Sequence, residues 1–212
     1  MKAYKHLVFD IDGTLIDTVN IHMVSLERIL KKFWGEDARI PDLRFSFGIP
    51  GEAAMEALKL PDPAEAHREW EKVYLSCAKE APGQLFPGMR ETLDRLKGTE
   101  TALGIITSKT RSEFEEDFRG RGLGSYFACV VTASDTSRGK PFPDPMLEYL
   151  RQTEAEPREV LYLGDSVHDM ECARKAGVDC ALVLWGSLMP EGIEATYRLE
   201  KPEEILDFVS LA

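Results

Sequence analysis

The feature that most constrains the fold is a regular alternation that begins at about residue 84. Short apolar runs such as "TALGIIT", "FACVVTA", "EVLYLGD" and "VDCALVLWG" alternate there with segments whose apolar residues have helical spacing. Such alternation is typical of βαβ units on a parallel sheet, whose right-handed crossovers bring all the carboxyl ends of the strands to one edge. With "KHLVFD" as the first strand, the sequence predicts an α/β fold: a doubly wound, Rossmann-like parallel sheet of five strands.

The first predicted strand is separated from the others by an insert, about residues 18–83, that contains no convincing strand. Its segments, "TVNIHMVSLERILKKFW" among them, carry apolar residues three and four positions apart, as an amphipathic helix does. We therefore expect two domains, a sheet-based core of residues 1–17 and 84–212 and an all-α domain of residues 18–83. Two chain segments join them and could act as a hinge.

Composition narrows the classes of function. The chain has 212 residues and a formal net charge of −11, which disfavours nucleic acid and anionic membranes as partners. No apolar run approaches the roughly 20 residues of a membrane span, and the first residues lack the features of a secretory signal. The four cysteines show no C-x-x-C spacing, so we expect free thiols. These observations predict a cytoplasmic protein without a nucleic-acid or membrane partner.

Two carboxylates, Asp10 and Asp12, end the first predicted strand in the stretch "LVFDIDGTL". Taken alone, an Asp-Gly pair more often marks a turn than a site. The position is nevertheless the carboxyl end of a strand, where open α/β sheets bind ligands. The pair is therefore a candidate for chemistry that needs two acidic groups.

Three further polar stretches follow predicted strands or lie in the connecting loops: "ITSK", "GKPFPDP" and "GDSVHD". All of them should meet "DIDGT" at the same edge. Together they offer carboxylates, a hydroxyl with backbone donors and an ammonium, a set that suits phosphoryl transfer through a metal ion. Each has an ordinary interpretation, Lys140 as a solvated lysine and Thr107, Asp165 and Asp169 as helix caps, but their coincidence at strand ends favours a functional site.

With these four stretches in this order, the chain resembles, over nearly its whole length, the haloacid dehalogenase superfamily of phosphatases. The "DIDGTL" stretch is the most specific of the four and the lone Thr107 the least specific. An insert between the first and second stretches is similar to the helical cap of the phosphoglycolate phosphatase-like and beta-phosphoglucomutase-like subgroup. The resemblance implies that residues 1–17 and 84–212 form the catalytic core and residues 18–83 the helical cap.

The resemblance also implies a division of labour between the first two carboxylates. Asp10 would attack phosphorus and become an aspartyl phosphate, a covalent intermediate that splits hydrolysis into two steps. Asp12 would be the general acid for the leaving oxygen and then the general base for water. A dehalogenase needs no such acid for its halide, so Asp12 favours phosphate chemistry.

Other core residues would bind the phosphoryl group. Gly13 would let the chain turn away without a side chain over the phosphate. Thr107, with the backbone N–H groups near Ser108 and Lys109, would hold phosphoryl oxygens. Lys140 would neutralise the charge that the phosphoryl group shares with the nucleophile.

A magnesium ion is the cofactor that the resemblance implies. Asp10, the backbone carbonyl of Asp12 and Asp165 would hold it, and Asp169 would order its waters or orient Lys140. Asp169 also stands where it could cap the following helix, and it could do both.

Two predictions concern the cap. His22 stands where beta-phosphoglucomutase-like members carry a histidine; it could assist the acid/base step, or it could simply pack on the first cap helix. Gly48 belongs to "FSFGIPGEAAM", the best candidate for a substrate loop, because its glycines and proline form a turn before a helix.

The predicted function is a Mg²⁺-dependent phosphatase acting on a small phosphorylated metabolite, with phosphoglycolate as the first guess, in a monomer or homodimer. A phosphomutase and an inorganic pyrophosphatase are alternatives on the same scaffold. A remote alternative is a receiver-like phosphoacceptor module for signalling, which also gathers acidic residues, a hydroxyl and a lysine at strand ends but has no cap.

Overall fold

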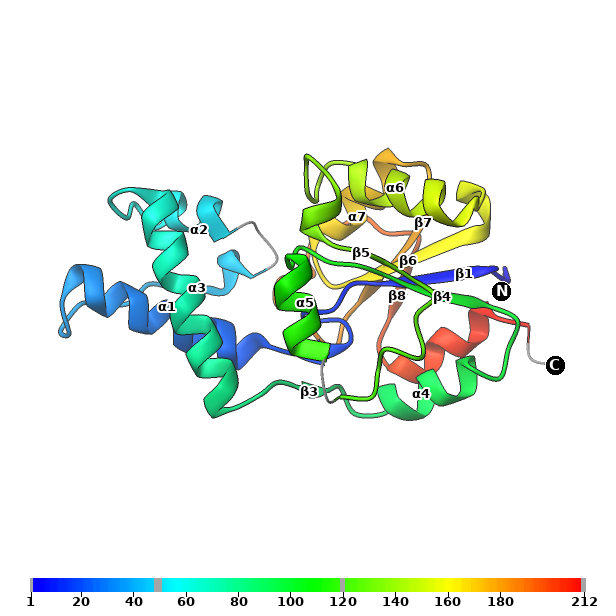
Figure 1. Cartoon of the computed structure of the whole chain (residues 1–212), viewed down its shortest axis with the longest axis horizontal. Helices are drawn as coiled ribbons and strands as arrows, with labels where there is room; N and C mark the ends of the chain where they lie inside the picture. The colour runs from blue at the N-terminus through cyan, green and yellow to red at the C-terminus, as the bar shows by residue number, and fades with distance from the viewer. Residues whose placement is uncertain (1, 48–50, 119–120, 211–212) are drawn as a thin grey trace. The chain divides into compact units, whose positions relative to one another are not determined.

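A computed structural model describes residues 2–47, 51–118 and 121–210 (Figure 1). The chain divides into two compact units, Met1–Leu15 with Leu85–Ala212, and Ile16–Gln84. The predicted boundaries differ from these by one or two residues. We call the first the sheet unit and the second the helical unit, and each is described by itself.

The sheet unit is built on a six-stranded sheet in the order β5-β4-β1-β6-β7-β8, and every pair of neighbours is parallel. The strands are β1 (His6–Phe9), β4 (Ala102–Ile106), β5 (Cys129–Val131), β6 (Val160–Gly164), β7 (Asp179–Val183) and β8 (Tyr197–Leu199). The predicted doubly wound α/β fold is confirmed.

The sixth strand, β8, is absent from the prediction. It has three residues, of which Arg198 is exposed and Leu199 buried, and it lies at the edge of the sheet beside β7. Because Arg198 interrupts the apolar residues, β8 lacks the continuous apolar run that identifies strands buried on both faces.

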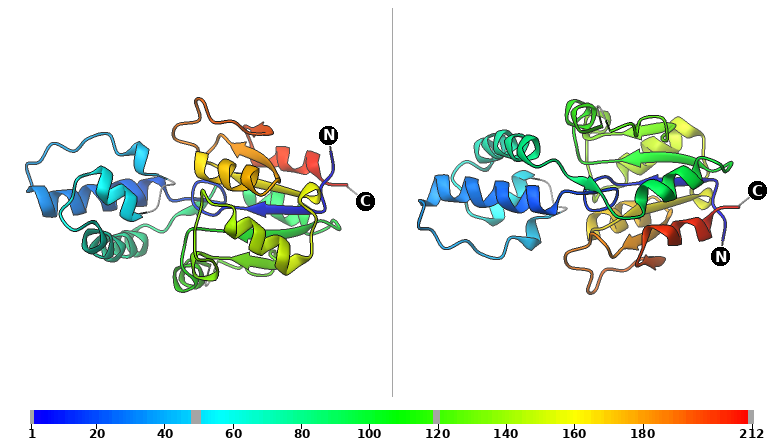
Figure 2. Two further views of the ribbon diagram at one scale, coloured as in Figure 1. Left: turned by 90° about the horizontal axis from the view of Figure 1, so that it is seen from above. Right: turned by 90° about the horizontal axis from the view of Figure 1, so that it is seen from below.

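Helices cover both faces of this sheet (Figures 1 and 2). The helix α6 (Asp144–Thr153) packs against β5 and β4 and α7 (Val167–Lys175) against β6 and β7, both on one face. The helix α4 (Met89–Leu96) packs with the 3₁₀ helix Pro202–Phe208 on the other face. A further helix, α5 (Arg111–Phe118), follows β4.

The largest fully buried side chains of the core include Tyr149 and Tyr162, which lie between the sheet and the pair α6 and α7. Burial of large apolar side chains contributes about 2 kcal/mol each, so this layer holds the helices firmly on the sheet. The register of the strands sets where they end. Phe9 pairs with Ile105 and Leu163, so the residues that follow β1, β4 and β6 lie at the same level along the sheet.

The helical unit consists of α1 (Val19–Trp34), the 3₁₀ helix Arg44–Ser46, α2 (Gly51–Ala57) and α3 (Pro63–Glu80). Leu26, Ile29 and Leu30 share one stripe of α1 and are fully buried against residues of α2 and α3 such as Met55. Asp62 caps α3 by accepting a hydrogen bond from the backbone N–H of Glu65, as an acidic residue before a helix-starting proline does.

Two short strands, β2 (Ile16–Asp17) and β3 (Gln84–Leu85), pair with each other where the chain enters and leaves the helical unit. Gly83 is needed beside them, because a Cβ atom there would lie 2.6 Å from the carbonyl oxygen of Asp17. Over the part of the chain that the structure describes, no helix has the length and apolar character of a membrane span.

Candidate active site

The carboxyl edge of the sheet gathers the polar residues that follow three neighbouring strands. Asp10 comes directly after β1, Thr107 after β4 and Asp165 after β6, and the shared register of these strands brings them to the same edge. Asp169 is reached from the first turn of α7, and Lys140 from the loop that precedes α6. Loops that are far apart in sequence therefore converge on one region.

Lys140 is buried at the centre of this group, with 7% of its surface exposed. Its Nζ atom lies 2.8 Å from Oδ1 of Asp10 and 2.7 Å from Oδ1 of Asp169. Burial by itself lowers the pKa of this lysine, but the two carboxylates outweigh burial and raise it above its ordinary value. Lys140 is thus a fixed positive charge that holds the predicted nucleophile in place.

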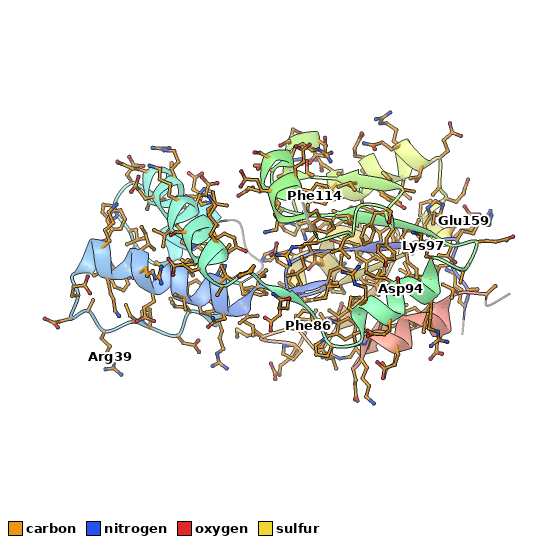
Figure 3. The ribbon with its side chains drawn as sticks, turned by 60° about the horizontal axis from the view of Figure 1, so that its bottom comes forward. Arg39, Phe86, Asp94, Lys97, Phe114 and Glu159 are labelled. Atoms are coloured by element: carbon orange, nitrogen blue, oxygen red, sulfur yellow. The ribbon has the colours of Figure 1, made fainter. Side chains whose placement is uncertain are left out.

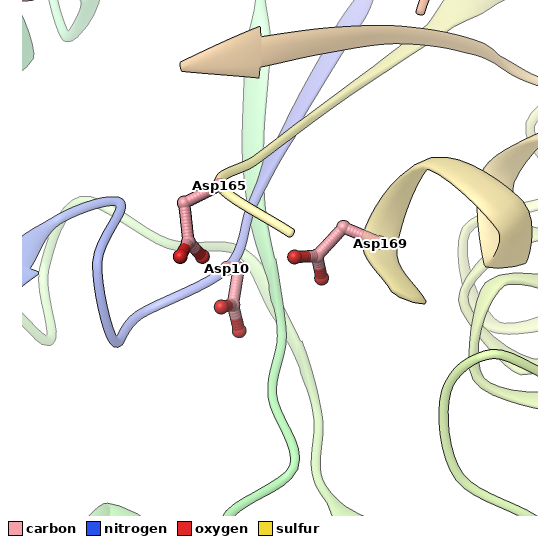
Figure 4. Close-up of side chains that lie close together, drawn as sticks. All are labelled: Asp10, Asp165 and Asp169. Atoms are coloured by element: carbon pink, nitrogen blue, oxygen red, sulfur yellow. The ribbon is translucent and has the colours of Figure 1, made fainter. Parts of the chain in front are cut away.

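Three carboxylates, those of Asp10, Asp165 and Asp169, form a buried triad (Figure 4). Each offers one oxygen, and these oxygens lie within 4.8 Å of one another. Burial raises the pKa of Asp10 to about 7, with repulsion from Asp169 and Asp12 adding to it and Lys140 opposing it. Burial and the neighbouring negative charges also raise the pKa of Asp165 well above its ordinary value.

One ammonium cannot balance three carboxylates. Burying an uncompensated charge is costly, and a divalent cation among hard oxygen ligands removes that cost. The donor set of the triad therefore fits a divalent metal ion.

Asp169 has a second role in the local structure. Its Oδ2 accepts hydrogen bonds from the backbone N–H of Ser166, at 3.1 Å, and from the hydroxyl of Ser166, at 2.5 Å, which forms a capping box at the start of α7. Tyr162 donates its hydroxyl to the other oxygen, Oδ1, at 2.9 Å. Burial would raise the pKa of Asp169, but Lys140 and these donors lower it below the usual value. The carboxylate caps a helix and takes part in the triad.

Asp12 belongs to a different ion pair from that of Asp10. Its Oδ2 lies 3.0 Å from Nζ of Lys109, whose side chain is buried. Its Oδ1 is buried and has no hydrogen-bond partner among the described residues. The two carboxylates of the first motif therefore pair with two different lysines.

The turn after Asp12 is enclosed by the loop that follows β7. Gly13 has a φ of 77°, a conformation that favours glycine. Trp185 donates its indole N–H to the carbonyl of Thr14 at 2.9 Å. A Cβ atom on Gly186 would lie 1.7 Å from the carbonyl oxygen of Gly13, so the two backbones touch directly.

The second motif forms a short bend after β4. Thr107 is buried, and its Oγ1 accepts the backbone N–H of Lys109 at 3.2 Å. Ser108 is exposed. The N–H of Lys109 is therefore used within the bend. The phosphate-binding roles of Thr107, Ser108 and Gly13 stay predictions.

The structure describes one of the two predicted cap residues, His22. His22 is buried inside the helical unit, where its Nε2 lies 2.9 Å from Oγ of Ser46 and its ring meets those of Phe47 and Trp70 edge-on. This environment matches the packing interpretation and leaves the catalytic one untested. Gly48 lies outside the described residues.

Sequence reasoning missed three contributors: the side chain of Lys109, the hydroxyl of Tyr162 and the Trp185-Gly186 pair. A signal existed for Tyr162, because a tyrosine inside the otherwise aliphatic run "VLYLG" needs a partner for its hydroxyl when buried. Lys109 carried a weaker signal, a lysine three residues beyond a buried strand. Nothing local indicates that Gly186 touches Gly13.

Comparison with known proteins defines the class. The family model described as haloacid dehalogenase-like hydrolase matches residues 7–183, so the chain belongs to this hydrolase family. The receiver-like alternative is thereby dropped.

Individual relatives narrow the class further. The chain is 30% identical to pyrophosphatase PpaX of Bacillus velezensis, covering 97% of this chain and 96% of the relative. It is 31% identical to a phosphorylated carbohydrates phosphatase of Thermotoga maritima, covering 95% of this chain and 96% of the relative. A crystal structure of a candidate phosphoglycolate phosphatase from Lactobacillus plantarum superposes with a TM-score of 0.87 at 30% identity, over 97% of this chain and 99% of that one. The chain is an enzyme of the phosphatase type.

Proposed function

We propose that this enzyme hydrolyses a small phosphomonoester, with phosphoglycolate as the first candidate, in a Mg²⁺-dependent reaction that passes through an aspartyl phosphate on Asp10. The observation that carries the proposal is the buried triad of Asp10, Asp165 and Asp169 with Lys140 bonded to two of its members. A carboxylate nucleophile, a counter-charge and a set of hard ligands meet there.

Mg²⁺ is the proposed cation because all the side-chain donors of the triad are carboxylate oxygens. Asp10, Asp165 and Asp169 would hold it, together with the backbone carbonyl of Asp12. When bound, the ion supplies positive charge that balances the carboxylates and polarises the phosphoryl group.

In the first step, an oxygen of Asp10 forms a bond to phosphorus while the bond between phosphorus and the leaving oxygen breaks. Asp12 gives its proton to that oxygen, so that an alcohol leaves instead of an alkoxide. Lys140, already 2.8 Å from Asp10, faces the charge that the nucleophile shares with the phosphoryl group.

In the second step, Asp12 accepts a proton from water as the water oxygen attacks phosphorus. The bond between Asp10 and phosphorus breaks, and inorganic phosphate leaves with Asp10 restored as a carboxylate. Thr107 and the backbone N–H groups near Ser108 hold phosphoryl oxygens during both steps, and Gly13 leaves room above them.

A second candidate is inorganic pyrophosphatase, which the name of the Bacillus velezensis relative favours. The same two steps apply, with phosphate as the leaving group. In either case the proposed substrate is a small phosphorylated metabolite, and the proposed enzyme is a cytoplasmic monomer or homodimer. A phosphomutase is the remaining alternative function.

The test is phosphate release from phosphoglycolate, hexose phosphates and pyrophosphate, each with Mg²⁺ and with EDTA, by the wild type and by Asp10→Asn. We expect release that requires both the metal and Asp10. A folded Asp10→Asn variant with full activity contradicts the covalent mechanism, and undiminished release in EDTA contradicts the metal requirement. Conversion of a hexose 1-phosphate to its 6-phosphate without net phosphate release would indicate the mutase.

A further inference from the structure

Lys109 is buried at the edge of the site and is not accounted for by the mechanism above. It is 9% exposed. Its backbone is held on both sides, since its N–H donates to Oγ1 of Thr107 at 3.2 Å and its carbonyl accepts the N–H of Ala133 at 2.8 Å. Burying a lysine side chain costs up to about 2 kcal/mol of rotamer entropy as well as desolvation. Such a residue persists where its ammonium has a specific task.

The ammonium of Lys109 is directed to Asp12. Nζ lies 3.0 Å from Oδ2 of Asp12, and this is the one hydrogen-bonding or ionic partner that the described residues give to that carboxylate. The other oxygen, Oδ1, is buried without a hydrogen bond. Among these contacts, the ion pair with Lys109 is the one that can orient the Asp12 carboxylate.

Lys109 and Lys140 form ion pairs with different carboxylates of the site. Lys140 pairs with Asp10 and Asp169 at 2.8 and 2.7 Å, and Lys109 pairs with Asp12. The two lysines come from different loops, one after β4 and the other before α6. The two carboxylates of the first motif thus pair with different buried lysines.

We propose that Lys109 is a positioning residue that holds the Asp12 carboxylate in the orientation needed for proton transfer to the leaving oxygen and from water. The inference rests on the proposed function, in which Asp12 carries that proton. Lys109 acts through Asp12 and does not itself exchange a proton with the substrate. When Asp12 has given up its proton, the ammonium lies beside the carboxylate that forms.

The test is a double-mutant cycle on the full-length enzyme with Lys109→Met, Asp12→Asn and the two combined. The probes are ethyl phosphate, which has a poor leaving group and no second anionic group, and p-nitrophenyl phosphate, whose leaving group needs no proton. Lys97→Met, which removes an exposed lysine at the end of α4 in the same unit (Figure 3), is the matched control.

On ethyl phosphate, we expect Lys109→Met to lower kcat on the order of 100-fold with KM changed less than about 3-fold, since positioned proton transfer contributes at least that factor. Adding Lys109→Met to Asp12→Asn should lower kcat no further, because residues that act through one another are not additive. Lys109→Arg should recover part of the loss. Lys97→Met should match the wild type.

With p-nitrophenyl phosphate, Lys109→Met should still release a rapid burst of one p-nitrophenolate per enzyme, because only the second step needs proton transfer. The subsequent steady rate should be slow. A merely structural defect would reduce the burst amplitude, and a role in binding the substrate would raise KM.

An effect of Lys109→Met that adds fully to that of Asp12→Asn, or an unchanged kcat, overturns the inference while leaving the proposed function in place. Failure of the proposed function is distinguishable, because it appears as phosphate release that survives Asp10→Asn. A raised KM on ethyl phosphate with unchanged kcat also overturns the inference and assigns Lys109 to substrate binding.

Discussion

The sheet unit and the helical unit both bury polar side chains, but they do so in opposite ways. In the helical unit, Trp70 donates to Ser25 at 2.8 Å and Ser25 to the carbonyl of His22 at 2.9 Å. Ser46 donates to the carbonyl of Leu43 at 2.6 Å, so Nε2 of His22 is the donor toward Ser46. The hydrogen bonds named here join neutral side chains and backbone carbonyls.

In the sheet unit, the buried groups of the triad are ionisable and their charges conflict. Burial and mutual repulsion raise the pKa values of Asp10 and Asp165, although Lys140 is nearby. A satisfied neutral network stabilises a fold, whereas an unbalanced buried charge is tolerated where a ligand or metal will balance it. From this difference we expect the cluster in the helical unit to serve structure and the cluster in the sheet unit to serve chemistry.

Lys140→Met should have the largest effect, because it leaves Asp10 and Asp169 without their shared counter-charge. We expect phosphatase kcat to fall on the order of 10³-fold and the free energy of unfolding to fall by about 3 kcal/mol. Steady-state kinetics and urea denaturation check these values. Lys5→Met, which breaks an exposed pair with Glu159 in the same unit, should change stability by less than about 1 kcal/mol. Equal effects of the two substitutions would remove the distinction between buried and exposed pairs.

Gly186→Ala tests the close contact between the backbones of Gly186 and Gly13 at the site. The new Cβ would lie 1.7 Å from the carbonyl oxygen of Gly13, so the turn beside Asp12 must move. Displacing catalytic groups by about 1 Å lowers activity up to about 100-fold. The variant should therefore lose 10- to 100-fold in kcat/KM, about the range that such a displacement allows. Gly124→Ala, where a Cβ would have open space, is the control and should be active. Wild-type kinetics for Gly186→Ala would show that the turn does not position Asp12.

The pH dependence of stability should reveal the charge conflict in metal-free protein. The pKa of Asp10 is raised from 3.8 to about 7, so between roughly pH 4 and pH 7 the folded state binds more protons than the unfolded state. Its contribution therefore makes the free energy of unfolding decrease as pH rises through this window. Asp165 acts in the same direction, and the lowered pKa values of His6 and His168 act in the opposite one.

Comparing the wild type with Asp10→Asn in EDTA cancels groups that do not interact with Asp10, such as His6. The pKa of Asp165 is raised partly by Asp10, so its smaller shift in the variant adds to the difference in the same direction. The Tm of the variant relative to the wild type should rise between pH 5 and pH 7.5, by at least about 3 °C. Saturating Mg²⁺ should stabilise the wild type more at pH 7.5 than at pH 5, since protons compete with the metal for the same oxygens. A pH-independent difference between the two proteins would mean that Asp10 has an ordinary pKa.

Ser46→Ala should have the smallest effect and the opposite character. Removing the hydroxyl leaves Nε2 of His22 without its acceptor and should cost about 1 to 2 kcal/mol of stability. We expect kcat to change less than 2-fold, about the limit of a purely structural loss. Ser76→Ala on the exposed face of α3 is the control. A large fall in kcat with unchanged Tm would instead favour the catalytic interpretation of His22.

Much of the fold could be predicted because its elements repeat a local pattern. The apolar runs of β1, β4, β6 and β7 are buried on both faces, and burial on both faces is what makes a run continuous in sequence. The edge strand β8 escaped because the exposed Arg198 interrupts its apolar residues, whereas the other edge strand, β5, is an uninterrupted apolar run of the same length. The helical insert was recognisable from the spacing of apolar residues that α1 presents to its neighbours.

The order of the four polar stretches, and their places at strand ends and in the connecting loops, can be read from the sequence, and the triad of Asp10, Asp165 and Asp169 follows from them. How the charges pair depends on the folded chain. Lys140 and Asp10 are 130 positions apart, and Lys109 reaches Asp12 from a different strand end. The spacing of apolar residues along a helix or strand indicates which of its residues are buried, because burial depends on which face of that helix or strand a residue occupies. The choice of partner depends on loops from separate elements meeting at one edge, and no local pattern carries that information.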